Sequence, residues 1–500
     1  MLDGLMTGFL SVIEPFHLFI LFLAVVIGFW GGALPGISGT MLVIILLPVT
    51  YTMDTTSAFL MLTGIYGATV FSGLITAILF RTPGTPEAVA TVFDGYPMAQ
   101  QGKAGQALGI GVLSSAAGGI FGTLVLIFLT PLLASVALEF SSPEFFALAF
   151  LGLTVVASLS GKNKIKGYIG VAFGLFIATI GMDPLSGTSR FDFNVSNLRT
   201  GVELIPVLIG LFALSEILKK SREDHTPKES IKKIKTKIFD SSILKQIGPT
   251  VGRSSLLGTF IGILPGIGAT TASMLSYSES VRWSKKPERF GKGAPEGIAA
   301  PESANNAAAM GALVPLLALG IPGSATTAVI LGAFVLHGLQ PGPNLMNSNS
   351  ELVYSIFVGV LFLNIMIILF AKPFISSFMV LMKIPYTILG PIIIVFCFIG
   401  TYAVRNSLFD VWIMLAFGLI GYFFEKAKFP MATVILGLVL GPIAESELRR
   451  ALQMSGGDIS VFFTRPISLS LLIIALLLLV GPMLKTPLKA MKTNNSSANS

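Results

Sequence analysis

The strongest constraint in this sequence is a succession of apolar runs, most of them long enough to cross a lipid bilayer as a helix. Such a span needs about 20 apolar residues. The runs lie at 16–50, 57–80, 106–138, 143–160, 167–184, 201–218, 253–278, 299–339, 352–371, 386–404, 408–424, 430–443 and 467–484. Only 12% of the residues are charged, about half of the share in soluble proteins. The pattern predicts an all-α polytopic membrane protein of about 10–12 membrane segments and excludes an ordinary soluble enzyme.

Lysine and arginine predict the orientation of the loops. Neither occurs between Met1 and Phe80, whereas the segment 219–245 carries nine of them. Because short cationic loops stay in the cytoplasm, we expect the N-terminus to face outward and the basic segment to face inward, near anionic lipid headgroups. The predicted organisation is a first transmembrane repeat at 1–218, a basic cytoplasmic linker at 219–250, and a second transmembrane repeat with C-terminal helices and a polar tail at 251–500.

Several other classes of protein are excluded. The net charge of +8 does not indicate nucleic-acid binding, because the basic residues cluster between apolar runs, where they are topology signals. One cysteine and three scattered histidines form neither a disulfide pattern nor a zinc pattern. The sequence contains no P-loop, Ser/His/Asp arrangement or Gly-rich dinucleotide turn, so we expect neither an enzyme nor a cofactor.

An internal repeat is marked by Pro-Gly pairs. Residues 32–40 read Gly-Ala-Leu-Pro-Gly-Ile-Ser-Gly-Thr, and residues 262–270 read Gly-Ile-Leu-Pro-Gly-Ile-Gly-Ala-Thr, an offset of 230. Residues 82–85 (Thr-Pro-Gly-Thr) are echoed at 321–324 (Ile-Pro-Gly-Ser), an offset of 239. The first copy starts outside and the second follows a cytoplasmic linker. We therefore expect two inverted-topology repeats with re-entrant or broken helices, as in many secondary transporters.

Each Pro-Gly pair is expected to interrupt a helix and to leave backbone N–H and C=O groups unpaired. A helix N-terminus followed by hydroxyl side chains is a natural site for a carboxylate. The candidate substrate-binding residues are Pro35, Gly36, Ser38, Thr40, Pro83, Gly84, Thr85, Pro265, Gly266, Gly268, Thr270, Pro322, Gly323, Ser324 and Thr326. Two alternatives remain open: the free carbonyls and hydroxyls coordinate sodium, or the pairs only kink packed helices.

The segment 253–278 is expected to form a hairpin rather than a single span. Basic residues flank it on both sides, so its ends face the same side of the membrane, yet about 26 residues are too few for two full crossings. The apex then falls at 264–268, Leu-Pro-Gly-Ile-Gly. Non-helical backbone at membrane depth persists only where it is buried in protein or lines a wet cavity. We expect the apex to face a cavity.

Acidic residues within the apolar halves are candidates for a coupling cation. Glu302, Asn305 and Asn306 share one helix face, and a carboxylate beside two amides is able to hold a cation or relay a proton. Glu87 and Asp94 lie seven residues apart, roughly on one face of their segment. The coupling-cation candidates are Glu302, Asn305, Asn306 and Asp94. In the alternative, Glu302 caps a helix and Asp94 starts a turn.

Long motifs in both halves resemble one known family, the large membrane subunit of tripartite tricarboxylate transporters (TctA-type). They lie at 64–68 (Gly-Ile-Tyr-Gly-Ala), 78–86 (Ile-Leu-Phe-Arg-Thr-Pro-Gly-Thr-Pro), 94–105 (Asp-Gly-Tyr-Pro-Met-Ala-Gln-Gln-Gly-Lys-Ala-Gly), 301–307 (Pro-Glu-Ser-Ala-Asn-Asn-Ala), 319–328 (Leu-Gly-Ile-Pro-Gly-Ser-Ala-Thr-Thr-Ala) and 338–343 (Gly-Leu-Gln-Pro-Gly-Pro). The similarity covers nearly the whole chain.

The resemblance implies a secondary transporter in the inner membrane of bacteria or archaea. Such systems import carboxylates such as citrate with a sodium or proton gradient. They pair this subunit with a small four-helix membrane subunit and usually a periplasmic solute-binding protein. The family's Pro-Gly breaks and its Pro-Glu-x-x-Asn-Asn element carry over to Pro35-Gly36, Pro83-Gly84, Pro265-Gly266, Pro322-Gly323, Glu302, Asn305 and Asn306. Apart from the resemblance, the hydroxyls and carbonyls at the breaks favour sodium as the coupling ion, and Glu302 leaves protons open as the alternative. A passive channel for organic anions is the alternative function.

Overall fold

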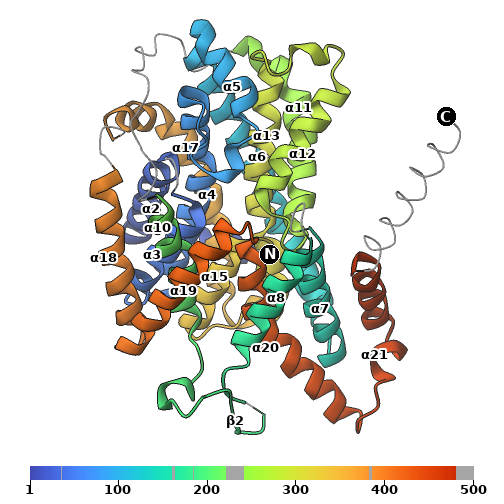
Figure 1. Ribbon diagram of the computed structural model, residues 1–500. Helices are drawn as coiled ribbons and strands as arrows, with labels where there is room; N and C mark the ends of the chain where they lie inside the picture. The colour runs from blue at the N-terminus through green and yellow to red at the C-terminus, as the bar shows by residue number, and fades with distance from the viewer. Residues whose placement is uncertain (35–36, 160–163, 184, 221–240, 382–385, 480–500) are drawn as a thin grey trace, which may run out of the picture. The chain divides into compact units, whose positions relative to one another are not determined.

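The structure, a computed structural model, describes residues 1–34, 37–159, 164–183, 185–220, 241–381 and 386–479, and nearly all of its regular elements are helices (Figure 1). The chain forms two compact units. The first contains Met1–Ala137 and Ile205–Phe423, and the second contains Leu138–Leu204 and Phe424–Ser500. The first unit thus takes segments from both predicted repeats. The linear division at 219–250 stays a prediction, and residues 221–240 of that linker lie outside the described residues.

The first unit contains helices from both halves of the sequence. In the N-terminal half these are α1 (Leu2–Val12), α2 (Pro15–Ala33), α3 (Gly39–Thr50), α4 (Thr55–Phe80), η1 (Pro86–Ala88), α5 (Val92–Met98), η2 (Ala99–Lys103) and α6 (Ala104–Ala137). They continue with α9 (Leu204–Leu208), η4 (Ile209–Leu214), α10 (Ser215–Lys220), α11 (Ser241–Ile263), α12 (Gly268–Trp283), η5 (Pro287–Arg289), α13 (Pro295–Gly311), α14 (Leu313–Leu319), α15 (Ala325–Leu336), α16 (Leu345–Ser348), α17 (Ser350–Leu381), α18 (Tyr386–Arg405) and α19 (Leu408–Lys426).

The second unit contains the remaining elements. They are α7 (Ser142–Leu159), α8 (Lys164–Ala178), β1 (Gly181–Met182), β2 (Ser189–Arg190), η3 (Ser196–Leu198), α20 (Met431–Met454) and α21 (Val461–Thr464). The two short strands pair antiparallel, and α20 packs against α7 and α8.

The composition of the helices confirms an all-α polytopic membrane protein. Among the described residues, six helices are long and apolar enough to cross a membrane: Pro15–Ala33, Thr55–Phe80, Val92–Ala137, Ser350–Ser377, Leu408–Lys426 and Met431–Met454. Six shorter apolar helices accompany them: Leu2–Val12, Gly39–Thr50, Ser142–Val155, Ala325–Leu336, Gly390–Arg405 and Pro466–Leu479. The number of crossings stays a prediction.

The predicted helix breaks are confirmed. Helix α2 ends before the first Pro-Gly pair and α3 begins after it, although Pro35 and Gly36 themselves lie outside the described residues. Helix α4 ends at Arg81 in a left-handed conformation (φ 58°). Helix α14 ends in the same way at Gly320 (φ 71°). The hairpin at 264–267 separates α11 from α12, and these two helices pack together. Its first arm begins at Ser241, earlier than predicted.

Glycines allow the helices that flank the breaks to approach closely. Helix α2 packs on α4 through Gly28 and Gly32, and α11 packs on α13 through Gly258 and Gly262. A Cβ at any of these four positions would lie less than 3.0 Å from the backbone of the facing helix. Small residues of this kind are what close packing of membrane helices requires.

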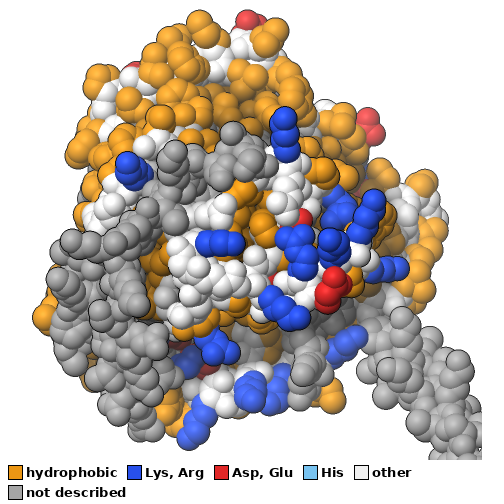
Figure 2. All heavy atoms as spheres, turned by 90° about the horizontal axis from the view of Figure 1, so that it is seen from above, with side chains coloured by type: hydrophobic (Ala, Val, Ile, Leu, Met, Phe, Trp, Pro, Cys, Tyr) orange, Lys and Arg blue, Asp and Glu red, His pale blue; other side chains and the backbone are white. Residues whose placement is uncertain are grey.

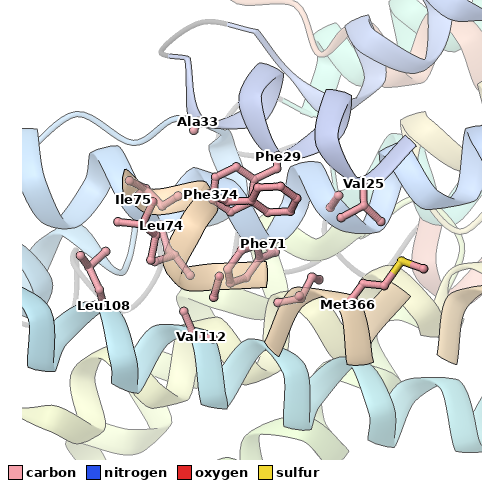
Figure 3. Packing of buried hydrophobic residues seen from close by; sticks show 14 of the residues in the cluster. Val25, Phe29, Ala33, Phe71, Leu74, Ile75, Leu108, Val112, Met366 and Phe374 are labelled. Carbon is pink, nitrogen blue, oxygen red and sulfur yellow. The ribbon is translucent and has the colours of Figure 1, made fainter. Parts of the chain in front are cut away.

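An aromatic core holds α2, α4 and α17 together (Figure 3). The ring of Phe29 on α2 lies 5.7 Å from that of Phe71 on α4 and 4.7 Å from that of Phe374 on α17, measured between centroids. All three side chains are buried. Large rings that bury 150–250 Å² each contribute strongly to such a core. This core fixes the helices that carry the breaks.

Exposed Lys and Arg side chains gather at one end of the first unit (Figure 2). They come from η2, the start of α11, the last turn of α12 and the segment between α12 and α13: Lys103, Lys245, Arg282, Lys285, Lys286, Arg289 and Lys292. Hydrogen bonds hold these segments side by side, from Gln101 to the carbonyl of Lys292 (2.7 Å) and from Gln246 to Glu296 (2.9 Å). This concentration of positive charge agrees with the cytoplasmic orientation that the sequence predicts for the loop.

Candidate functional site

Two helix N-termini from opposite halves of the sequence meet inside the first unit. Helix α3 packs against α15, and the hydroxyl of Thr40 lies 2.7 Å from the hydroxyl of Thr326. Each threonine is the second residue of its helix. The N-terminal ends of α3 and α15, which carry partial positive charge and unpaired amides, therefore lie beside each other.

Serine caps shape both of these N-termini. The side chain of Ser38 accepts a hydrogen bond from the amide of Met41 (3.1 Å). Ser324 accepts one from the amide of Thr327 (3.2 Å), and the hydroxyl of Thr327 accepts one from the amide of Ser324 (2.8 Å), which completes a capping box. The caps occupy the third amide of each helix. The first two amides have no acceptor within their own helix.

Tyr66 on α4 is a further member of this group. Its hydroxyl lies 3.3 Å from the hydroxyl of Ser324, and the side chain is almost fully buried. Thr40, Ser38, Ser324, Thr326 and Tyr66 together place four aliphatic hydroxyls and a phenol around the two helix ends. Hydroxyls and backbone amides are donors suited to a carboxylate.

Within each half, the two breaks touch. A Cβ at Gly84 would collide with the carbonyl oxygen of Gly32, and a Cβ at Gly323 would lie 2.7 Å from the carbonyl oxygen of Gly262. The two glycine pairs stand in corresponding positions of the repeat. In the second half the amide of Gly266 also donates to the carbonyl of Gly323 (2.9 Å). Glycine is required here because the backbones approach too closely for a side chain.

The candidates Pro265, Gly268 and Thr270 lie at the hairpin between α11 and α12 and are partly exposed. Gly266 and Gly268 both have positive φ, 75° and 74°, which favours glycine. Helix α12 packs against η1, the turn that follows Pro83 and Gly84. The second arm of the hairpin, α12, thus lies beside the turn that follows the second break of the first half.

Glu302 lies at the centre of a fully enclosed polar network on α13. Its carboxylate accepts hydrogen bonds from Thr91, from Ser115 (2.9 Å) and from Asn305 (3.5 Å). Asn306 donates to the side chain of Asn305 (2.8 Å) and to the carbonyl of Glu302 (3.1 Å). The helix face predicted for Glu302, Asn305 and Asn306 is therefore confirmed, and its role in cation binding stays a prediction.

Asp94 has different partners. Its carboxylate accepts from the amides of Gly293 (2.8 Å) and Ala294 (2.7 Å), just before α13, and from the hydroxyl of Tyr277 (2.9 Å). The side chain is completely buried. All three donors come from the C-terminal half of the sequence. The geometry therefore favours a structural role, in which Asp94 caps the backbone before α13 and links the two halves of the sequence. The coupling-cation role predicted for Asp94 is not tested.

Sequence reasoning did not single out Tyr66, Thr91 or Ser115 as members of these clusters. A signal existed for Tyr66, which precedes Asn305 by 239 residues, the offset of the downstream Pro-Gly pairs. Asn305 donates to the backbone carbonyl of Glu87 after the break of the first half (3.3 Å), much as Tyr66 contacts Ser324 after the break of the second.

Comparison with known proteins decides the family. The model of the tripartite tricarboxylate transporter TctA family matches residues 18–436, which contain both pairs of breaks and the Glu302 network. The chain belongs to the TctA family. A relative from Agrobacterium vitis, "Uncharacterized 52.8 kDa protein in TAR-I ttuC' 3'region", is 38% identical over 476 residues and 95% of each chain.

A second relative from the same organism covers part of the chain. "Uncharacterized protein in TAR-II ttuC' 3'region" is 43% identical over 215 residues, which are 43% of this chain and 89% of the relative. No solved structure matches the chain. TctA proteins are membrane components of tricarboxylate transport systems and not an enzyme family. The chain is therefore a multi-pass membrane protein with a transport role.

Proposed function

We propose that this TctA protein imports a small carboxylate, a tricarboxylate or dicarboxylate of the citrate type, by secondary active transport. The observation that carries the proposal is the contact between Thr40 and Thr326, because it places two capped helix N-termini from opposite halves side by side. Each end supplies two amides and a hydroxyl to an anion. Two adjacent positive helix ends suit a substrate with more than one carboxylate.

The inverted repeat is part of this proposal. The pairing of α2 with α4 has a counterpart in the pairing of α11 with α13, and Gly32 and Gly84 have counterparts in Gly262 and Gly323. This correspondence supports a duplication. Inverted repeats in transporters place the substrate near the bilayer midplane on interrupted helices, and alternating access arises when one repeat moves against the other.

The assembly and the coupling are also proposed. TctA membership supports a small four-helix membrane subunit and a periplasmic solute-binding protein as partners, and the inner membrane of a bacterium or archaeon as the location. A sodium or proton gradient drives import, with Glu302, Asn305 and Asn306 as candidate coupling residues. A bound cation offsets the charge of a carboxylate in a site of low dielectric.

Uptake by proteoliposomes tests the proposal. Purified TctA protein, with and without its small membrane subunit and binding protein, is reconstituted and offered a panel of labelled mono-, di- and tricarboxylates. Sodium and pH gradients are imposed separately. We expect accumulation of a di- or tricarboxylate above its external concentration only when a cation gradient is present. Flux that merely equilibrates the carboxylate without a gradient would establish the alternative, a passive channel.

A further inference from the structure

Two buried hydroxyl groups at the Pro83-Gly84 break have no hydrogen-bond partner among the described residues. They are Oγ1 of Thr76 on α4 and Oγ1 of Thr85 at the start of η1. Both side chains are at most 1% exposed. Most buried polar groups are paired, and each exception calls for an explanation such as an ion. Two exceptions at a single break point to a ligand.

The two hydroxyls face the same small region. A Cβ at Gly84 would lie 2.8 Å from Thr76 Oγ1 and even closer to the carbonyl oxygen of Gly32. A Cβ at Gly73, whose carbonyl accepts from the amide of Gly84 (3.2 Å), would touch Thr85 Oγ1. Oxygen atoms from α2, α4 and the break therefore converge around Gly84.

A carboxylate adjoins these oxygens. Glu87 lies on η1, and its carboxylate lies beside the hydroxyl of Thr85 without a well-formed hydrogen bond to it. It is also close enough to Tyr66 and Glu302 for electrostatic interaction. Within the described part of the chain neither Glu87 nor Glu302 forms an ion pair with Lys, Arg or His. Glu302 is stabilised by three donors, whereas Glu87 is not. Glu87 is partly buried, and only the hydroxyl of Thr85 and its own backbone adjoin its carboxylate among the described residues, so a cation at this position would stabilise its charge.

The corresponding break of the second half lacks this chemistry. At the offset of 239, Thr76, Thr85 and Glu87 correspond to Pro315, Ser324 and Thr326. The Ser324 hydroxyl is used in a capping box, and a hydroxyl replaces the carboxylate. One break is thus acidic and rich in unpaired oxygen, while the other is uncharged and rich in donors. The first suits a cation and the second an anion.

We propose that a sodium ion binds at the Pro83-Gly84 break, between the carboxylate of Glu87 and the hydroxyls of Thr85 and Thr76. Hydroxyl, carboxylate and backbone oxygens are ligands for hard cations, and no group of three or more His, Cys, Asp or Glu that would favour a transition metal occurs among the described residues. The proposal rests on the proposed function, since it names the coupling ion, and it reassigns Thr85 from the substrate to the cation.

Binding of ²²Na⁺ to the purified full-length protein in detergent, at constant ionic strength in choline chloride, tests this site without any carboxylate. We expect saturable binding by the wild type that potassium does not displace. E87Q, T85V and T76V should weaken it by about tenfold or more, because each removes a ligand of the charge. T76S and T85S keep the oxygen and should bind nearly as the wild type.

The control is T130V. Thr130 on α6 also has a buried, unpartnered hydroxyl, but it lies outside the break, so its loss should leave sodium affinity unchanged. Unfolding curves without sodium show which variants fold. If E87Q does not fold, the sodium affinities of T76V and T76S are compared instead. Absence of sodium binding by the wild type overturns the site, as does loss of binding in E302Q with retention in E87Q. Carboxylate uptake is measured separately, so its failure with intact sodium binding contradicts only the proposed function.

Discussion

The hydroxyl of Thr40 on α3 lies 2.7 Å from the hydroxyl of Thr326 on α15, although 286 residues separate them in the sequence. The contact joins the first break of one half to the second break of the other. Each helix end alone offers only a few donors and a partial charge of about half a unit. The pair brings the donors of both ends to one region, which is the carboxylate site that we propose.

Thr326→Val removes one of these hydroxyls with almost no change in volume. A hydrogen bond to a charged group contributes about 1.5–3 kcal/mol, so the KM of carboxylate uptake should rise about tenfold or more. Thr326→Ser should restore it. Thr123→Val is the matched control, since among the described residues that hydroxyl bonds to Gly119 of its own helix. Equal KM values for all of these proteins would remove Thr326 from the site.

Gly84→Ala places a methyl group against the carbonyl of Gly32. Overpacking of this kind costs about 1–3 kcal/mol, so thermal unfolding in detergent should occur at a lower temperature and uptake should fall. In Gly252→Ala the new Cβ meets nothing within 4 Å. That control should be neutral or up to about 1 kcal/mol more stable, because alanine favours helix. Identical unfolding temperatures and uptake of both variants would show that Gly84 is able to move away from Gly32 without a loss of stability or transport.

Asp94→Ala leaves the amides of Gly293 and Ala294 and the hydroxyl of Tyr277 without their acceptor. Each buried group that loses its partner costs about 1–3 kcal/mol, so this variant should unfold at a clearly lower temperature. Asp94→Asn retains an acceptor oxygen and should be destabilised less. The cation dependence of uptake should stay unchanged in Asp94→Asn. A shift in cation affinity at normal stability would instead favour the coupling role predicted from the sequence.

The ion pair of Asp183 in the second unit should make the unfolding temperature depend on pH. The ion pair with Arg449 (2.7 Å), followed by hydrogen bonds from Leu185 and Ser186, holds the pKa of its carboxyl well below the usual range. A carboxyl with a depressed pKa in the folded state stabilises the fold above its unfolded pKa of about 3.9, and this contribution is lost as the pH falls below that value. Unfolding temperatures of the wild type should therefore drop between about pH 4 and pH 2.

Asp183→Asn is the comparison for that titration. Its unfolding temperature should be lower than that of the wild type at neutral pH, and the difference should shrink as the solution becomes acidic. High salt should weaken the effect, because the pair is near the surface. A constant difference at every pH would mean that the carboxylate charge does not contribute to folding.

The sequence predicts the helix breaks well, because Pro-Gly pairs act on the local backbone. The sequence does not predict which residues contact each other across the breaks. Tyr66 lies within a long apolar helix and shows no local sign of its contact with Ser324. Asp94 precedes a glycine, which is typical of a turn, but the amides that donate to its carboxylate come from a loop 199 and 200 residues away. Such contacts depend on how the two halves pack, and hydropathy carries no information about that.

The boundaries of the hairpin show a second limit. Hydropathy predicts that its first arm starts at 253, whereas α11 starts at Ser241. The polar first turns of α11 are held by contacts with other segments, among them the bond from Gln246 to Glu296 on α13 (2.9 Å). Hydropathy marks the part of a helix that contacts lipid or core, and a helix continues beyond it where polar partners are available.

The most direct test of the central claim is substrate protection of a cysteine at the paired helix ends. Thr40→Cys is built in a Cys397→Ser background, because Cys397 is the sole native cysteine, and its modification by a charged methanethiosulfonate reagent is timed. The account predicts that a transported carboxylate slows modification in proportion to its occupancy, while its uncharged amide analogue has no effect. Modification at an unchanged rate in the presence of every carboxylate that the protein transports would contradict the account.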